Sequence, residues 1–183
     1  MEDTNWKPLR IEEPFLKGQL ALWLPARGAV QVRVSVDGAE PNPDTIRQLL
    51  STAGYLKTSI AKSRPIWTGL YARDQTEITV VSRPGIDIEA ALGDGTIFVA
   101  ECKGEATQSG IRAGTDLTSL YTALGQLIRR AGEMSTLPQE KALVIPDTGR
   151  LRRIAREIAR NQFIQLLGIA LLLVDAQEKV SRA

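Results

Sequence analysis

The sequence predicts an α/β protein of the α+β type, with a mixed central β-sheet flanked by helices. In several short segments before residue 104, apolar residues alternate with polar ones, which is the period of a half-buried strand. A long apolar stripe with helical spacing follows, and then the pattern goes strand, helix, strand, which favours parallel pairing through crossover helices. A chain of 183 residues suits one core better than two, so we expect a single globular unit.

The first 38 residues are expected to form an N-terminal extension and a β-hairpin. The start is polar and contains prolines, which is typical of an extended segment. Apolar residues then occupy every second position in 20–24 and again in 30–36. These two runs flank a turn that ends at Gly28, which predicts a hairpin. We expect the hairpin to extend the sheet or to form the contact of a possible homodimer.

Residues 39–183 are expected to form the main domain. Its first element is a helix from Asp44 to Gly54, since aspartate suits a helix start and three apolar side chains follow with helical spacing. Four strands are expected next, at 66–71, 77–81, 86–92 and 96–103. The last elements are a helix at 116–131, a strand at 143–146, a helix at 149–162 and a strand at 168–175.

The composition excludes several kinds of catalytic site. The chain has no histidine, which removes the commonest general base and every Ser-His or Cys-His nucleophile pair. Its one cysteine, Cys102, cannot form an intrachain disulfide or a Cys-x-x-Cys zinc site. Chemistry is left to carboxylates, lysines, arginines and hydroxyls. The net charge of +2 means that any basic surface must be local.

The sequence predicts neither a secretory signal nor a membrane span. The N-terminus begins with acidic residues and lacks an apolar core. The longest apolar stretch runs from Phe163 to Val174, which is about half of the ~20 residues that a spanning helix needs. We therefore expect a cytoplasmic protein with no membrane contact.

Two acidic residues and a lysine on neighbouring strands form the candidate catalytic site. Glu101 and Lys103 share one face of their strand, and Asp87 lies on the strand before it. A two-residue turn would set Asp87 against Cys102, on the wrong face. A three-residue loop, Gly93-Asp94-Gly95 with its last glycine left-handed, sets Asp87 against Glu101. Cβ atoms of opposed residues lie roughly 4.5–5.5 Å apart, a separation that suits two carboxylates sharing one metal ion.

Magnesium, or manganese in its place, suits these ligands. Mg²⁺ prefers oxygen ligands and keeps several waters, so Asp87, Glu101 and a backbone carbonyl would form an open site. The ion would polarise a phosphoryl group and lower the pKa of a bound water, and Lys103 would orient that water or stabilise charge on phosphate. Without a metal, two carboxylates this close repel each other.

These residues resemble the PD-(D/E)XK nuclease superfamily, which has the restriction-endonuclease-like fold. The resemblance rests on Asp87 in "PGID", on Glu101-Cys102-Lys103 in "VAECKG" and on the lack of histidine. It also rests on the order of elements between residues 44 and 175, because the superfamily's core is a helix, three antiparallel strands, a helix and a further strand. The resemblance therefore implies a restriction-endonuclease-like core.

A metal-dependent DNA nuclease that hydrolyses phosphodiesters is the function that the resemblance implies. Asp87 and Glu101 would bind Mg²⁺ together with the carbonyl of Cys102, and Lys103 would be the catalytic lysine. Gln126, in "LGQLIRR", resembles a glutamine that many members place near the site.

The chain departs from the superfamily's pattern at two positions. Members that keep a glutamine often have a tyrosine four residues later, where this chain has Arg130. An acidic residue is often found in the first core helix, and the helix expected at 44–54 offers no clear match. A further metal ligand from that helix is therefore not expected.

Arginines on two expected helices are candidates for contacts with DNA. Two of them share the polar face of the helix at 116–131, and three recur every four residues along the next helix, which places them in one row. Phosphate contacts dominate affinity for nucleic acids, although such a row can equally be a solvated helix face. The candidates are Arg129, Arg130, Arg152, Arg156 and Arg160.

Other interpretations stay open. Asp87, Glu101 and Lys103 could form a surface salt-bridge ladder without chemistry. The chain could also be a catalytically silent nuclease-fold module for DNA binding or assembly, or an enzyme or sensor whose pocket binds a nucleotide. Cys102 is interpreted as a small core residue on the opposite face of its strand, beside Phe98 and Ala100.

Overall fold

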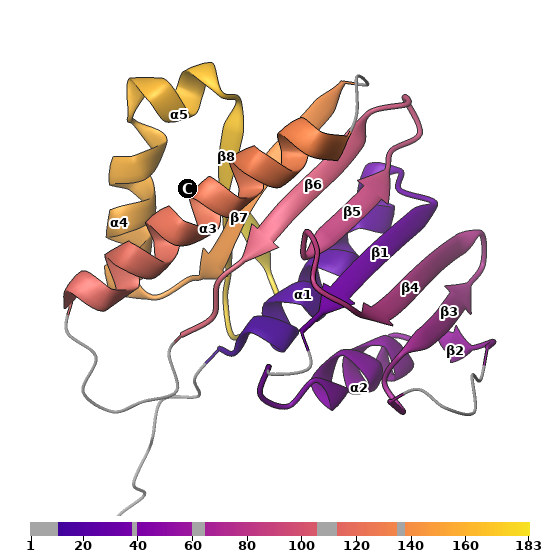
Figure 1. Cartoon of the computed structure of the whole chain (residues 1–183). Helices are drawn as coiled ribbons and strands as arrows, with labels where there is room; N and C mark the ends of the chain where they lie inside the picture. The colour runs from indigo at the N-terminus through magenta and orange to yellow at the C-terminus, as the bar shows by residue number, and fades with distance from the viewer. Residues whose placement is uncertain (1–10, 38–39, 60–64, 106–112, 135–137) are drawn as a thin grey trace, which may run out of the picture.

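A mixed β-sheet with helices on both faces is the framework of the computed structural model, which describes residues 11–37, 40–59, 65–105, 113–134 and 138–183 (Figure 1). The strands are β1 (Gln31–Val36), β2 (Leu56–Lys57), β3 (Gly69–Arg73), β4 (Thr76–Ser82), β5 (Ile88–Ala91), β6 (Ile97–Cys102), β7 (Gln139–Pro146), β8 (Ile169–Val174) and β9 (Val180–Arg182). The helices are α1 (Glu13–Trp23), the 3₁₀ helix η1 (Leu24–Arg27), α2 (Asp44–Thr52), α3 (Ala113–Met134), α4 (Gly149–Ala159) and α5 (Gln162–Leu166). The strand order is β2-β3-β4-β1-β5-β6-β7-β8-β9.

The N-terminal region folds as helix α1, so the predicted hairpin is wrong. Pro14 lies in the first turn and Glu13 begins it, and both suit a helix start, where an N–H can be missing and an acid is favoured. Leu16, Leu20 and Leu24 are spaced four apart and are fully buried. The alternation between residues 20 and 24 fits a strand equally well, and packing of the longer stripe against the sheet selects the helix.

Strand β1 lies in the middle of the sheet, not at an edge. It pairs in parallel with β4 and antiparallel with β5. Its valines, Val32, Val34 and Val36, belong to the same buried cluster as the leucines of α1. The described part of the predicted N-terminal extension therefore shares one sheet and one core with the strands that follow.

The β5–β6 hairpin has the register that the three-residue loop predicts. Ile88 pairs with Ala100, and Gly95 has a φ of +84°, the left-handed conformation that the loop requires. Continuing the ladder by one residue sets Asp87 opposite Glu101. The turn chemistry of this segment thus determines which side chains meet.

The second half of the chain follows the predicted alternation of helices and strands. β6 pairs in parallel with β7, and β7 pairs in parallel with β8. The helix expected at 149–162 is α4, which ends at Ala159. The short helix α5 was not predicted, and it starts where the side chain of Asn161 accepts the N–H of Phe163. Strands β2 and β9 were not predicted; both are short.

Two apolar cores lie on opposite faces of the sheet. One contains buried side chains of α1 and α2, and the other contains those of α3, α4 and α5, as the two helix layers in Figure 1 indicate. Among the described residues no helix is long and apolar enough to cross a membrane. The fold is the mixed, helix-flanked sheet that the sequence predicts.

Candidate functional site

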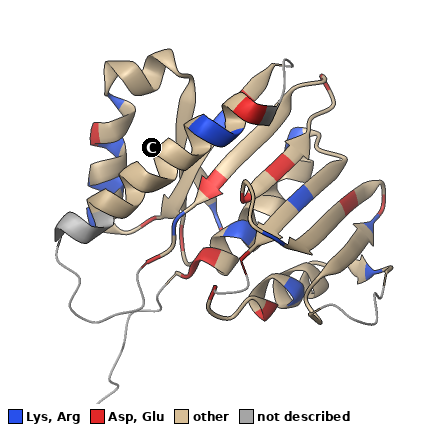
Figure 2. Cartoon of the chain, in the orientation of Figure 1, with Lys and Arg blue, Asp and Glu red and all other residues tan. Residues whose placement is uncertain are grey.

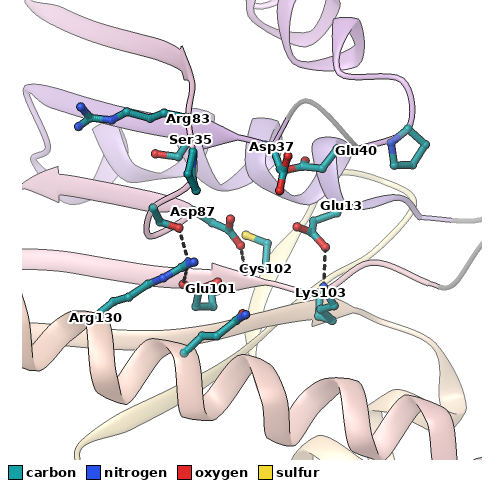
Figure 3. Close-up of a pocket in the computed structure, with 14 residues that line it drawn as sticks. Glu13, Ser35, Asp37, Glu40, Arg83, Asp87, Glu101, Cys102, Lys103 and Arg130 are labelled. Atoms are coloured by element: carbon teal, nitrogen blue, oxygen red, sulfur yellow. Dashed lines mark hydrogen bonds and ion pairs between the residues drawn. The ribbon is translucent and has the colours of Figure 1, made fainter.

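A pocket of about 320 Å³ opens where β1 and β6 end and β5 begins, with α1 and α3 on either side (Figure 3). Acidic and basic segments meet at this place in Figure 2. The charged residues that line the pocket are Glu13, Asp37, Glu40, Arg83, Asp87, Glu101, Lys103 and Arg130.

Asp87 is buried, and both oxygens of its carboxylate have partners. Oδ2 accepts the N–H of Cys102 at 2.8 Å, and Oδ1 lies 2.8 Å from Nζ of Lys17. The backbone carbonyl of Asp87 accepts the N–H of Ser35 at 2.8 Å. These contacts join Asp87 to α1, β1 and β6 at once, so its position is set by three elements.

Glu101 is the second buried carboxylate, with 4% of its side chain exposed. Its Oε1 lies 2.6 Å from a guanidinium nitrogen of Arg130, which also donates to the carbonyl of Gly85. Burial and the nearby Asp87 carboxylate raise the pKa of Glu101 to about 8, although Arg130 opposes the rise. Asp87 and Glu101 therefore interact, as their register predicts.

Lys17 is the most enclosed charged side chain of the pocket region, with no exposed surface. Burial by itself would lower the pKa of its ammonium, but the surrounding carboxylates outweigh burial and raise it above its usual value. The contacts of its Nζ are Glu40 Oε1 at 2.6 Å, Asp87 Oδ1 at 2.8 Å, the carbonyl of Ser35 at 3.0 Å and Glu13 Oε1 at 3.3 Å.

Glu40 reaches the pocket from the segment between β1 and α2. Its Oε1 accepts the N–H of Asp37 at 2.7 Å in addition to Lys17. Its Oε2 is buried and, within the described part of the chain, has no hydrogen-bond partner. Burial raises the pKa of Glu40, and Lys17 opposes that rise. A buried oxygen without a partner costs free energy, so this atom could accept a ligand.

Lys103 and Glu13 meet at the mouth of the pocket. Nζ of Lys103 lies 3.2 Å from Oε2 of Glu13, and 39% of the lysine side chain is exposed. Glu13 holds Lys17 with its other oxygen, so it links the enclosed lysine to the accessible one. Lys103 is the cation of this network that a molecule in solution could reach.

Cys102 has the place that the sequence predicts. Its side chain is buried with Phe98 and Ala100 in the core beneath α1. Burial raises the pKa of the thiol well above its usual value, so the thiol stays neutral. The contribution of Cys102 to the site comes from its backbone, whose N–H holds Asp87.

The predicted residues of α3 divide between the pocket and the surface. Gln126 is half-buried and lines the pocket. Arg130 also lines it and is engaged with Glu101. Arg129 is exposed and is the residue of this pair that faces solvent.

The row of arginines runs along α4 to Arg160, the residue directly after it, and does not line the pocket. Because β6 and β7 are parallel, α4 starts at the sheet edge where the pocket lies, and Arg160 is about 12 Å further along the helix axis than Arg152. Arg152 pairs with Asp147 through two bonds of 2.6 and 2.7 Å. Arg156 and Arg160 are exposed.

Five charged residues in or beside the pocket were not predicted from the sequence: Glu13, Lys17, Asp37, Glu40 and Arg83. Glu13 and Lys17 are spaced by one helical turn and flank Pro14, which is a helix-start signal that the alternation after residue 19 obscured. Glu40 stands in a proline-rich break without periodicity, and only the folded chain brings it to Lys17.

No family model, curated protein or solved structure matches this chain.

Proposed function

We propose that this protein is a metal-dependent DNA nuclease of the PD-(D/E)XK type. The observation that carries the proposal is the meeting of Asp87, Glu101 and Lys103 at one end of the sheet. Asp87 directly precedes β5, whose first residue pairs with Ala100, and Glu101 follows Ala100 in β6. Lys103 comes two residues after Glu101, directly after the end of β6. All three line one pocket.

The order of elements also supports the proposal. Helix α1 is followed by β1, β5 and β6, each antiparallel to the next in the sheet, then by α3 and by β7. This is the order of the superfamily's core if α2, β2, β3 and β4 are an insertion between β1 and β5. The first core helix is then α1, not the helix at 44–54. Glu13 of α1 supplies the acidic residue that the segment 44–54 lacks.

The residues of the pocket fit a divalent metal ion. Asp87, Glu101 and the carbonyl of Cys102 would hold Mg²⁺ or Mn²⁺, and Glu13 is a further candidate ligand. All are oxygen donors, which these ions prefer. The pKa of Glu101 is raised by burial and, second, by the nearby Asp87 carboxylate, and a cation would relieve the repulsion between the two acids. When bound, the ion would polarise a phosphoryl group and lower the pKa of a water molecule.

Lys103 is the side chain best placed to act on a substrate. Its ammonium is partly exposed and is held on one side by Glu13, which limits the positions that it can take. From there it would stabilise charge that develops on a phosphate or orient the attacking water. Gln126, on the opposite wall of the pocket, offers an amide for a further contact with phosphate or water.

Attraction to DNA would come from exposed arginines, because the net charge is small. Arg129 lies on the helix that carries Gln126, Arg156 lies on α4, and Arg160 directly follows α4. Their guanidinium groups are accessible and suit contacts with phosphates. Arg130 and Arg152 are engaged with Glu101 and Asp147, so they are weaker candidates.

A catalytically silent DNA-binding or assembly module is the second candidate function. The observation that favours it is that protein cations already neutralise both central carboxylates, with Lys17 on Asp87 and Arg130 on Glu101. Such pairs stabilise the fold without a metal. The same protein would then bind DNA and leave it intact.

A cleavage assay with purified protein distinguishes these two functions. Supercoiled plasmid, linear duplex and single-stranded DNA are incubated with Mg²⁺, Mn²⁺ or a chelator. We expect metal-dependent cleavage by the wild type, and loss of at least about 100-fold in rate for Lys103→Ala, as for removal of one group that stabilises transition-state charge. The matched control is Glu89→Gln, which removes a carboxylate next to the site on β5.

Equal cleavage by the wild type and Lys103→Ala would refute the proposed mechanism. DNA binding without cleavage of any substrate in either metal would favour the silent module. Cleavage of free nucleotides or cyclic nucleotides, with DNA left intact, would overturn the choice of DNA as substrate.

A further inference from the structure

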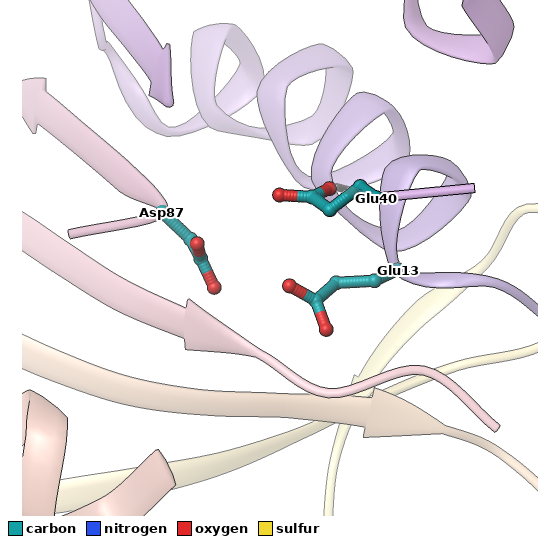
Figure 4. A group of neighbouring side chains, drawn as sticks. All are labelled: Glu13, Glu40 and Asp87. Carbon is teal, nitrogen blue, oxygen red and sulfur yellow. The ribbon is translucent and has the colours of Figure 1, made fainter. Parts of the chain in front are cut away.

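The ammonium of Lys17 occupies a cluster of carboxylates that could hold a metal ion. Glu13, Glu40 and Asp87 each offer one oxygen, and these three oxygens all lie within 4.8 Å of one another. The three side chains converge from α1, from the segment before α2 and from the start of β5 (Figure 4). Nζ of Lys17 contacts one oxygen of each.

The negative charge of the three carboxylates exceeds the single positive charge of Lys17. One ammonium faces three carboxylates, and the second lysine nearby, Lys103, is partly exposed and pairs with Glu13. Buried groups of one sign repel strongly when their charge is not balanced. The described part of the pocket therefore retains an attraction for a further positive charge.

Glu40 provides an independent sign that a ligand is missing. Its side chain is nine-tenths buried, and its Oε2 has no hydrogen-bond partner among the residues that the structure describes, although its Oε1 has two. A carboxylate oxygen that is desolvated and unpaired is poised to bind a cation.

We propose that Lys17 is the resident cation of a binding site for a divalent metal ion formed by Glu13, Glu40 and Asp87, and that a metal ion enters this site by displacing its ammonium. A tethered ammonium competes with any ion from solution, so the wild type binds metal weakly at this cluster. A dication balances more of the negative charge than an ammonium does and takes only oxygen ligands, which the cluster and the carbonyl of Ser35 supply.

This inference rests on the proposed function in one respect, which is that Asp87 and Glu13 are shared with the proposed catalytic metal site. It predicts that Lys17 controls the metal concentration at which the site fills. The test reads metal binding and stability, and neither requires cleavage of DNA. A protein that cleaves nothing could therefore still confirm the exchange between lysine and metal.

The experiment compares Lys17→Met with the wild type, using the full chain. Affinity for Mn²⁺ is measured by titration calorimetry, and thermal unfolding is followed in chelator and in Mn²⁺ with KCl matched for ionic strength. We expect Lys17→Met to unfold at a lower temperature in chelator, to regain stability in Mn²⁺ and to bind Mn²⁺ at least tenfold more tightly than the wild type. Lys141→Met, which removes the same charge from β7, should leave the affinity unchanged.

Two double variants locate the metal ion. In Lys17→Met/Glu40→Gln the gain in Mn²⁺ affinity should fall by at least tenfold, because the cluster has lost a carboxylate. In Lys17→Met/Glu101→Gln most of the gain should remain, because Glu101 lies outside the cluster. The opposite pattern, with Glu101 essential and Glu40 indifferent, would place the ion between Asp87 and Glu101 and overturn the proposed site.

An affinity of Lys17→Met equal to or weaker than that of the wild type would overturn the proposal. If Lys17→Met does not fold in chelator, its far-ultraviolet circular dichroism is measured while Mn²⁺ is added. Recovery of the folded signal would confirm that a metal ion replaces the ammonium, and no recovery at saturating Mn²⁺ would overturn it.

Discussion

Lys17 and Arg130 both bring positive charge to the pocket, but the structure uses them differently. Lys17 comes from α1, is fully buried and contacts three carboxylates and one carbonyl. Arg130 comes from α3, is half-buried and contacts Glu101 and the carbonyl of Gly85. Lys17 is therefore part of the core's electrostatic balance, whereas Arg130 covers a carboxylate that can also be neutralised by a proton.

The two cations therefore differ in how much stability the fold loses without them. A buried carboxylate without its cation is costly unless it takes up a proton. Glu101 has a pKa of about 8, so it can become neutral near physiological pH. The three carboxylates around Lys17 would all have to be neutralised at once, which makes Lys17 the harder of the two cations to replace.

Removing Lys17 should produce the largest loss of stability. We expect Lys17→Ala to lower the free energy of unfolding in chelator by about 3–5 kcal/mol, the cost of leaving a buried charge without its partner. Denaturant unfolding at neutral pH measures the loss. Lys103→Ala is the matched control, and because its side chain is 39% exposed, a loss below about 1 kcal/mol is expected there. Similar losses in the two variants would remove the contrast between a buried and an accessible lysine.

The stability lost when Arg130 is removed should depend on pH. Burial and Asp87 raise the pKa of Glu101 to about 8, so Glu101 carries more negative charge, and depends more on Arg130, as the pH rises through this value. The stability loss of Arg130→Ala should therefore be larger at pH 9 than at pH 6, as measured by denaturant unfolding in chelator. An equal loss at both pH values would show that Glu101 does not titrate in this range.

The titration of Glu101 also predicts how the stability of the wild type changes with pH. The pKa of Glu101 is raised on folding, so the folded state binds more protons than the unfolded state between about pH 4.5 and 8, and its contribution to stability falls as pH rises through that window. The Glu101→Gln variant has no such group, so its stability in chelator should fall less steeply than that of the wild type over the same range.

The exposed arginines of α4 should have the smallest effect on the fold. Arg156→Ala/Arg160→Ala should change the free energy of unfolding by less than about 0.5 kcal/mol for each substitution. If these arginines contact phosphates, the double variant should bind DNA more weakly. The slope of the logarithm of the DNA-binding constant against the logarithm of salt concentration should become shallower by roughly one per lost contact. Arg73→Ala on β3 is the control. If the double variant binds DNA as tightly as this control does, the row of arginines is a solvated face without DNA contacts.

The parts of the site that could be predicted from sequence lie close together in the chain. Asp87, Glu101 and Lys103 belong to one hairpin, and Gly95 supplies the left-handed residue that determines its register. The short distance along the chain means that local turn chemistry decides which side chains face each other. Gln126 was predicted to lie near the site, and it lines the pocket.

The prediction failed where two periodicities competed. The leucines at 20, 22 and 24 fit a strand, while those at 16, 20 and 24 fit a helix, and packing against the sheet selects the helix. This error also concealed the site's second half, because Glu13 and Lys17 meet the pocket only when α1 is a helix. Arg130 was expected on the polar face of its helix. It lines the pocket because its guanidinium group pairs with the buried carboxylate of Glu101.

The amino-acid sequence by itself determined the chemistry available to this protein and the hairpin that presents it. The lack of histidine leaves carboxylates and lysines, and the loop at 93–95 brings two carboxylates together through contacts between neighbours in the chain. The pairing of Lys17 with Asp87 and of Arg130 with Glu101 follows only from the tertiary structure. The two cations come from segments 29 to 70 residues away from their partners Asp87 and Glu101, and the packing of α1 and α3 on opposite faces of the sheet is what brings them to one pocket.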